Sequence, residues 1–513
     1  MTAARRLRGG DWTPAGGRGT AAARTRRWRT PALAGLVGVL AACGGGGDSL
    51  PGHSRPILAH DWPEPSALDL SASTFTPPNP AGARFVASSG LEAYIVTNPS
   101  DPLVRITAAL PLGRLREADG EAGASALLVR LLTTRGAARA RRPLPLRLAE
   151  LGATLTTDEA LDVASISLDV LPEDWRAGLD LLIQLLRDPD LDAATVRQYR
   201  AGAGYSMPMA GIGGDGFRPK VELERRVAGY PLAPADQGTT VSLAAVRALA
   251  ARGLRADRVV LGVGGAVSRD QVEAAIESGT RGWAAAGDAP RSLAPIEARE
   301  NPGPFHAIDA PSLEGWIAIG RAVGSVPEVD QAALAVLRFI LAERLNIAAR
   351  EIRGLANRDD FEIPGTASGA GLITVRTGGR PEAVAPLVRF SLDEIERLHD
   401  ANDPVTDAEV RRAQGWLVRA VWQRSLELAS GASATFPVER ARRGGTDRLM
   451  DWPRAVLAVT AADVKAVAQR YLEPGSLVTV VVGPLARIRE ARHPRWPVAL
   501  GELEASLAGR RVR

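Results

Sequence analysis

Residues 241–250 read VSLAAVRALA and residues 459–468 read VTAADVKAVA, so the same pattern occurs twice, 218 residues apart. The match continues in register from VVLGVGG at residues 259–265 to LVTVVVG at residues 477–483. Each copy predicts a helix with a hydroxyl cap at its start, then a turn and a strand of β-branched residues that ends in glycine. The repeat therefore predicts two homologous halves.

A weaker repeat lies upstream of both copies. Pro172-Glu173, a helix pattern and residues 192–197 parallel Pro381-Glu382, another helix pattern and residues 406–411. Chance similarity between alanine-rich helices is the alternative, but it explains two segments in the same order poorly. Because strands flank long amphipathic helices, we predict an α+β fold. In it, each half is an α/β sandwich with helices on one face of a sheet, and the two halves form a clamshell.

The predicted organisation has six parts. A glycine-rich start marks the second part as a flexible tether, and prolines mark the fourth as a linker. The parts are a signal peptide (1–43), the tether (44–80), an N-terminal domain (81–275), the linker (276–300), a C-terminal domain (301–490) and a tail (491–513).

Composition excludes several classes of protein. Of the 513 residues, 45% are hydrophobic and 24% charged, which is typical of a folded chain and excludes one that is disordered throughout or crosses a membrane many times. The single cysteine cannot form an internal disulfide or a Cys-type zinc site. The net charge of +5 comes from eight arginines within residues 1–42, and the rest of the chain is slightly acidic. We therefore expect no nucleic-acid partner.

The N-terminal segment has the form of an export signal. Arginine-rich sequence precedes a run of about 11 apolar residues, which is too short to cross a bilayer. The run ends in Leu-Ala-Ala-Cys43, which resembles the lipobox of bacterial lipoproteins and implies a lipid on Cys43. The alternative is an ordinary signal peptide with an incidental cysteine. By resemblance to lipoprotein sorting, Gly44 favours the cell envelope, at the periplasmic face of the outer membrane.

Several segments, in order, resemble the pitrilysin/insulinase family of zinc metallopeptidases, which includes the mitochondrial processing peptidases and the core proteins of respiratory complex III. They are GLEAYIV at residues 90–96, LPED at residues 171–174 with the helix pattern after it, and the RL…RE-x-RGLA stretch at residues 344–356. The resemblance extends over residues 85–485.

The residues that bind zinc in this family are missing. Active members carry H-x-x-E-H on a helix, where two histidines bind zinc and the glutamate activates water. Here Ala126, Val129 and Arg130 occupy these positions, with Val129 in place of the base. The family's third ligand falls in residues 199–207, which contain no carboxylate. The five histidines form no H-x-x-x-H pair, so the sequence predicts no metal ligands, no catalytic residues and no zinc cofactor.

Residues that contact substrate in the family are partly kept. The resemblance assigns substrate binding to Arg353 and to Asn357, which replaces a tyrosine. A helix-end ion pair is the alternative role for Arg353. Family members also add an extended peptide to a sheet edge, which here corresponds to residues 153–160. A merely tolerated exposed edge is the alternative there.

The sequence therefore favours a non-peptidase homologue. The leading hypothesis is a lipid-anchored partner subunit that contributes peptide contacts to a separate zinc-bearing homologue in a heterodimer. The alternatives are a structural or peptide-holding scaffold without a protease partner and, less favoured, an active zinc metalloendopeptidase. One further expectation is that Arg130 replaces the lost cation by pairing with Asp158 or Glu159.

Overall fold

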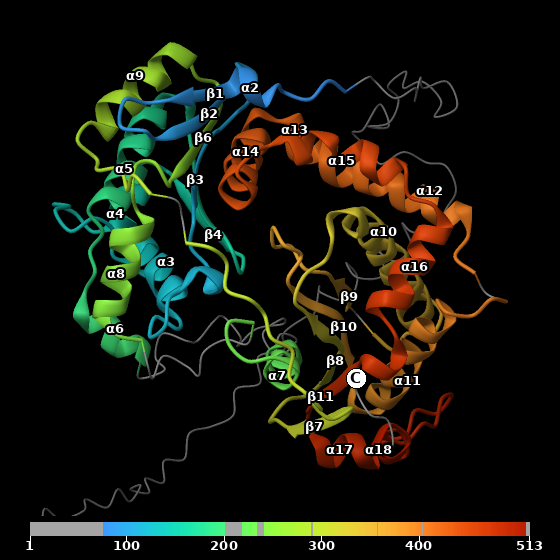
Figure 1. Ribbon diagram of the computed structural model, residues 1–513. Helices are drawn as coiled ribbons and strands as arrows, with labels where there is room; N and C mark the ends of the chain where they lie inside the picture. Colours follow the sequence, from blue (N-terminus) through green and yellow to red (C-terminus); the bar gives the residue numbers. More distant parts are fainter. Residues whose placement is uncertain are drawn as a thin grey trace, which may run out of the picture. The chain divides into compact units, whose positions relative to one another are not determined.

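A computed structural model describes residues 75–200, 218–232, 241–288, 291–356, 358–402 and 404–508 (Figure 1). Phe75–Arg513 forms one compact unit. The predicted signal peptide, Cys43 and the tether up to residue 74 lie outside the described residues. Within the described part of the chain, the helices are too short or too polar to span a bilayer.

The first half contains a six-stranded mixed sheet in the order β1-β2-β6-β3-β5-β4. Strands β2 and β6 are parallel, and the other neighbours are antiparallel. The strands are β1 (Arg84–Val86), β2 (Glu92–Thr97), β3 (Val104–Leu110), β4 (Thr154–Glu159), β5 (Ala164–Val170) and β6 (Val260–Gly265). The longer helices of this half are α3 (Ala124–Thr134), α5 (Trp175–Arg187), α7 (Arg218–Val227), α8 (Leu243–Gly253) and α9 (Arg269–Thr280). The short ones are α2 (Pro80–Ala83), η2 (Arg114–Arg116), α4 (Leu144–Glu150), η3 (Pro172–Asp174) and α6 (Ala193–Arg200).

The second half repeats this plan with five strands in the order β7-β11-β8-β10-β9. Strands β7 and β11 are parallel, and the other neighbours are antiparallel. The strands are β7 (Phe305–Asp309), β8 (Gly315–Val323), β9 (Arg358–Glu362), β10 (Gly371–Gly379) and β11 (Val478–Gly483). The α-helices are α10 (Glu328–Leu345), α11 (Pro381–Arg397), α12 (Asp407–Gly415), α13 (Arg424–Glu427), α14 (Ala429–Arg443), α15 (Asp447–Leu457), α16 (Ala461–Tyr471), α17 (Leu485–Glu490) and α18 (Leu500–Ala508). The π-helical segments η5 (Asn346–Glu351) and η6 (Trp416–Gln423) extend α10 and α12, and η7 (Pro474–Ser476) is a 3-10 turn.

The predicted repeat is present at the predicted offset. Helix α8 and strand β6 of the first half correspond to α16 and β11 of the second, 218 residues later at both ends. The predicted hydroxyl caps are formed: Ser242 accepts a hydrogen bond from the amide of Ala245, and Thr460 accepts one from the amide of Asp463. The prediction of an α+β fold with two homologous halves is therefore confirmed.

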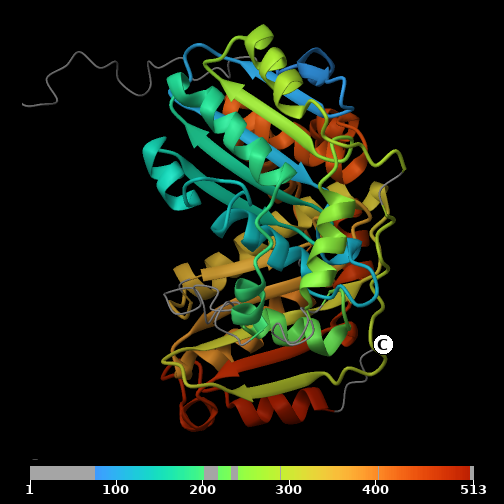
Figure 2. The same cartoon turned by 90° about the vertical axis from the view of Figure 1, so that its left-hand side faces the viewer.

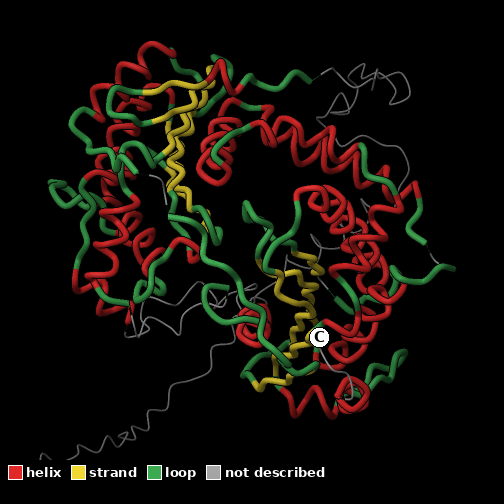
Figure 3. The backbone as a smooth tube through the Cα atoms, in the orientation of Figure 1, coloured by secondary structure: helices red, strands yellow, loops and turns green. Residues whose placement is uncertain are grey.

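Both faces of each sheet are buried. Because side chains alternate along a strand, neighbouring residues of one strand pack into different cores. In β2, Ala93 and Ile95 belong to the core that also contains residues of α3, α5, α8 and α9, whereas Tyr94 between them faces the other way and packs against Phe436 of α14. In the second sheet, Val481 joins the core under α10, α11 and α16. Its neighbours Val480 and Val482 join a separate core with α7. Figure 3 shows the strands in yellow among helices in red.

The helix that covers the second face of each sheet comes from the other half of the chain. Helix α14 lies against β2, β3 and β6 of the first sheet, and α7 lies against β8, β10 and β11 of the second (Figures 1 and 2). As predicted, the other longer helices of each half cover one face of that half's own sheet, and the second face is covered by the helix from the other half. The sequence shows that α7 and α14 are amphipathic but not which sheet they cover, because that choice depends on contacts between distant residues.

Candidate functional site

Helix α3 contains the three positions that the family resemblance assigned to the zinc motif. It runs from Ala124 to Thr134, and most of its apolar side chains pack into the core of the first half. Val129, to which the resemblance assigned the position of the catalytic base, is buried in that core. Ala126 is half-buried and Arg130 is exposed. The three positions thus carry two alkyl side chains and one solvated cation.

The N-terminus of α3 is held by a buried carboxylate. Glu117 accepts hydrogen bonds from the backbone amides of Gly123 at 3.0 Å and of Ser125 at 2.7 Å. The hydroxyl of Ser125 donates to the carbonyl of Gly113 at 3.2 Å. Burial raises the pKa of Glu117 to about 7, although the two amide hydrogen bonds act in the opposite direction. The helix is therefore rigidly positioned at the end that leads into the motif positions.

The expectation that Arg130 replaces the lost cation by pairing with an acid of β4 was wrong. Arg130 is exposed, and among the described residues it forms no ion pair with Asp158 or Glu159. A guanidinium that is already hydrated gains little from such a pair on an exposed surface. Desolvation by nearby protein atoms and the neighbouring charge of Asp158 raise the pKa of Glu159 to about 7, whereas the charge of Arg114 acts in the opposite direction.

The donor set on α3 does not fit a catalytic zinc ion. Such an ion needs three protein ligands from nitrogen, oxygen or sulfur donors and one open position. Ala126 and Val129 have no donor atom, and an arginine side chain stays protonated in proteins. Across the residues that the structure describes, His, Cys, Asp and Glu side chains form no group of three that could hold a metal. The resemblance places the third ligand within residues 199–207, and residues 201–207 of this segment lie outside the described residues.

The three histidines in the described part of the chain make local contacts. Nε2 of His306 lies 2.7 Å from the carbonyl oxygen of Pro302, and Nε2 of His399 lies 3.2 Å from that of Leu472. His493 stacks on Trp496 with 4.9 Å between ring centres. These contacts are far apart in the sequence and suggest no shared site.

Arg353 is in contact with aromatic rings and a helix end. Its Nη1 donates to the carbonyl of Ala348 at 2.6 Å. Its guanidinium carbon lies 4.2 Å from the centre of the Phe390 ring and 5.8 Å from that of Trp496. Such contacts stabilise the end of η5 and the segment that carries Trp496. They match the helix-end alternative, with a carbonyl and two rings in place of a carboxylate. The substrate-binding role of Arg353 stays a prediction, and Asn357 lies outside the described residues.

The strand predicted to bind an extended peptide is an edge strand. Strand β4 is the last in the order of the first sheet, where it pairs with β5, and nearly all of its side chains are exposed. An edge strand presents backbone donors and acceptors on its outer side, which an extended peptide can pair with.

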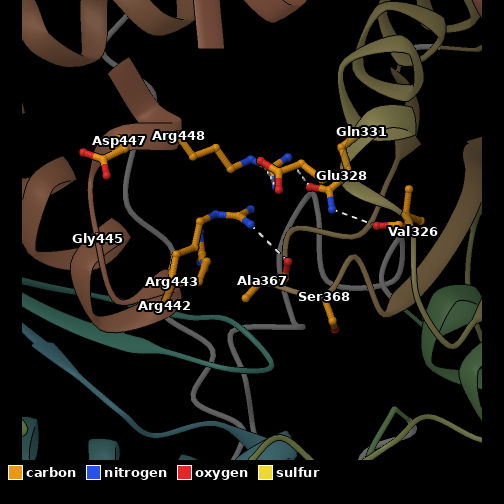
Figure 4. A pocket seen from close by; sticks show the side chains of 10 residues that line it. All are labelled: Val326, Glu328, Gln331, Ala367, Ser368, Arg442, Arg443, Gly445, Asp447 and Arg448. Carbon is orange, nitrogen blue, oxygen red and sulfur yellow. Dashed lines mark hydrogen bonds and ion pairs between the residues drawn. The ribbon is translucent and has the colours of Figure 1, made fainter. Parts of the chain in front are cut away.

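Sequence reasoning missed a pocket in the second half. It has a volume of about 540 Å³, and Arg442, Arg443 and Arg448 project into it from the end of α14 and the start of α15 (Figure 4). The signal was available in the sequence, since residues 439–448, ERARRGGTDR, contain four arginines around a Gly-Gly pair.

Comparison of sequences identifies one family. Residues 240–415 match the profile of the peptidase M16 inactive domain. The match begins near the end of the first half and extends over much of the second. No curated protein matches the chain.

Solved structures share the fold. The chain is similar to the peptidase M16 inactive domain from Pseudomonas fluorescens, with 20% identity and a TM-score of 0.65 over 80% of this chain and 98% of that one. It is also similar to a protease from Helicobacter pylori, with 16% identity and a TM-score of 0.66 over 78% of this chain and 99% of that one. A chain of complex III2 from Candida albicans matches with 16% identity and a TM-score of 0.60 over 79% of this chain and 96% of that one. At these identities the likeness concerns the fold alone.

Proposed function

We propose that this chain is a catalytically inactive partner subunit of a separate zinc-bearing homologue. The proposal starts from its membership of the M16 family, the pitrilysin/insulinase-type peptidases that the sequence resembles. In this heterodimer the homologue holds the metal, and this chain contributes contacts to the peptide substrate.

One observation carries the proposal. Both halves keep the family fold, while the three motif positions on α3 hold Ala126, Val129 and Arg130. Val129 is buried in a packed core, so the base position has become part of the hydrophobic interior. A chain that keeps the shell but has lost these donors is suited to binding and assembly rather than to zinc-dependent hydrolysis.

Peptide contacts are proposed at two places. The outer side of β4 offers unpaired backbone groups to an extended chain. Arg353 and Asn357 are proposed to support the peptide from the second half by the family resemblance. Lipidation at Cys43 would hold the subunit at the periplasmic face of the outer membrane.

Coexpression with a zinc-motif homologue from the same genome tests the pairing. We expect a 1:1 complex whose chelator-sensitive peptidase activity exceeds that of either chain alone. Zinc content is measured on each purified chain and on the complex, and we expect the metal only in the homologue. Stoichiometric zinc and chelator-sensitive cleavage in this chain alone would show instead an active endopeptidase. A lone, monomeric chain that leaves the activity of the homologue unchanged would refute the pairing.

A pair of proline variants tests the edge strand. In an antiparallel sheet the backbone amides of successive residues point to opposite sides, so one of Thr156 and Thr157 donates to β5 and the other points outward. Proline removes an amide and is tolerated at a sheet edge where that amide is unpaired. We expect one of T156P and T157P to keep the melting temperature of the original chain while peptide binding falls at least about tenfold. Unchanged binding in the well-folded variant would exclude edge pairing.

A peptide-holding scaffold is the second candidate, favoured by the exposed edge β4 and by the fold match to a chain of a multi-subunit complex. Fluorescence anisotropy with extended peptides separates the two functions. Peptide binding by the isolated chain, without any stimulation of the zinc-bearing homologue, supports the scaffold.

A further inference from the structure

The pocket at the junction of α14 and α15 brings three guanidinium groups together. It is lined by two segments of the α14–α15 region and by residues 326–331 and 367–368. In Figure 4, Arg448 reaches across the pocket toward Gln331 and Glu328, and Arg443 points toward the backbone of Ala367. Its volume of about 540 Å³ lies within the range of small-molecule sites in proteins.

The three arginines differ in how well their guanidinium groups are paired with carboxylates and hydrogen-bond acceptors of this chain. Arg443 is the best satisfied, with Nε 3.1 Å from Glu439 and Nη1 donating to the carbonyl of Ala367 at 3.0 Å. Arg442 shares Glu439 at 3.7 Å, and its buried Nε has no hydrogen-bond partner although it lies 3.4 Å from Asp162. The side chain of Arg442 is only 15% exposed, so water has little access to its guanidinium group.

Arg448 has the weakest carboxylate partner. Its Nη2 donates to the amide oxygen of Gln331, which is uncharged, and its Nη1 lies 3.4 Å from Glu328. The side chain of Glu328 is 74% exposed, so its charge is largely screened by solvent. Burial, followed by the positive charge of Arg443, lowers the pKa of Arg448.

Two helices begin at residues that line the pocket. Helix α10 begins at Glu328 after Pro327, and α15 begins at Asp447 after Thr446, and neither N-terminus is capped by a side chain. The positive end of a helix dipole favours a bound anion. Asp447, in the first turn of α15, is exposed, and Figure 4 shows its carboxylate turned away from the guanidinium of Arg448.

We propose that this pocket is a binding site for a compact oxyanion with two or more negative charges, of the phosphoryl or polycarboxylate type. Planar guanidinium forks bind such oxygens in pairs, and Arg448 and Arg442 supply guanidinium groups whose ion pairs in this chain are long. Arg442 and Arg443 share the carboxylate of Glu439, and that of Glu328 beside Arg448 is largely exposed, so a bound oxyanion would add ion pairs to guanidinium groups that these carboxylates satisfy only in part. The site is separate from α3 and β4, so it stands independently of the proposed partner function.

Isothermal titration of the full chain at constant ionic strength tests the site, with pyrophosphate and citrate as separate probes. We expect saturable 1:1 binding of at least one of them. Binding of pyrophosphate at least tenfold tighter than citrate identifies a phosphoryl ligand, and the reverse order identifies a polycarboxylate. Saturable binding of neither probe overturns the proposal.

Two pairs of variants assign the binding to this pocket. R448Q removes the weakly paired guanidinium, whereas R454Q removes an arginine of the same helix that is 81% exposed and paired with Asp451. We expect R448Q to weaken the bound probe at least tenfold and R454Q to leave it unchanged. An equal loss in both variants would show diffuse surface attraction and overturn the proposal.

The second pair keeps the test decisive if R448Q does not fold. A β-carbon at Gly445 would meet no atom within 4 Å, so a side chain fits there. We expect G445D to abolish binding by placing a carboxylate among the arginines, and G445A to bind normally. Normal binding by a folded G445D would refute the assignment.

Discussion

The two exchanged helices cover their sheets in different ways. Helix α14 approaches the first sheet at backbone distance: a β-carbon added at Gly262 or Gly264 of β6 would overlap the carbonyl oxygens of Ser433 and Ala429. Helix α7 packs on the second sheet through side chains, with Leu223 among those that meet β11. In the repeat, Gly262 and Gly264 correspond to Val480 and Val482. The arrangement is shared by both halves, but the closeness of the contact is set by two residues in one strand.

The charges at the two contacts also differ. At α14, Arg440 lies 2.9 Å from Glu92, which also pairs with Arg84 at 2.8 Å and accepts a hydrogen bond from Tyr94. Burial acts to raise the pKa of Glu92, but the hydrogen bonds from the arginines outweigh it and the pKa is lowered. At α7, burial raises the pKa of Glu224, and the nearby cations do not compensate for it. One contact thus stabilises a charge and the other disfavours it.

The largest expected effect comes from making β6 resemble β11. We expect G262V to prevent the first half from folding, because the added atoms overlap the backbone of α14, which cannot shift without leaving the sheet. Soluble yield and the circular dichroism melting curve check this. A G262V chain that melts like the original would contradict the close approach of α14.

Shortening the side chain at the equivalent position of β11 has a smaller effect. We expect V480A to lower stability by about 2 kcal/mol, because it removes buried methyl groups between β11 and α7 but overlaps nothing. Thermal melting beside G262V measures the contrast. Similar losses in the two variants would show that backbone closeness does not distinguish the contacts.

The ion pairs provide a third comparison. We expect R440M to cost about 2 kcal/mol, since a charge-assisted hydrogen bond to a buried carboxylate is lost while Arg84 remains. We expect K220M on α7 to cost about 1 kcal/mol or less, because its partner Glu362 keeps Arg376 at 2.9 Å. A larger loss of stability in K220M than in R440M would show that the ion pair of α7 contributes more than that of α14.

The smallest expected effect is the pH dependence of the two acids. The raised pKa of Glu224 means that its native form holds a proton that the unfolded form releases, so its contribution to stability falls as pH rises from its ordinary pKa through the raised one. We expect E224Q to gain about 1–2 °C in melting temperature over the original chain between pH 5 and pH 8. The charged groups near Glu224 on α7 and its neighbours are Arg114, Lys220, Glu362 and Arg225.

Glu92 provides the matched control with the opposite sign. Its lowered pKa gives stability that is present above the ordinary carboxyl pKa and is lost as pH falls below it. We therefore expect E92Q to be destabilised at pH 7 and less so near pH 3. If the stabilities of E92Q and E224Q, relative to the original chain, changed with pH in the same direction, both contacts would favour the same protonation state of their carboxyl groups.

Parts of the candidate site were predictable from local sequence. That Ala126, Val129 and Arg130 of α3 offer no metal-binding atom follows from their residue types, and the edge position of β4 was predicted from a short polar strand. The contacts of Arg353 with Phe390 and Trp496 were not predictable, because they join segments that are 37 and 143 residues away in the chain. The pocket arginines were visible as a run in the sequence, but the residues at the start of α10 that line the pocket with them were not predictable.

The sequence by itself determined the duplicated α+β halves and the caps of α8 and α16, because periodicity and capping are local properties. Only the tertiary structure decided that α7 and α14 exchange sheets, how closely each one packs, and that three arginines share one pocket. These features depend on which surfaces meet, and the pattern of apolar residues records that a face is buried without recording what buries it.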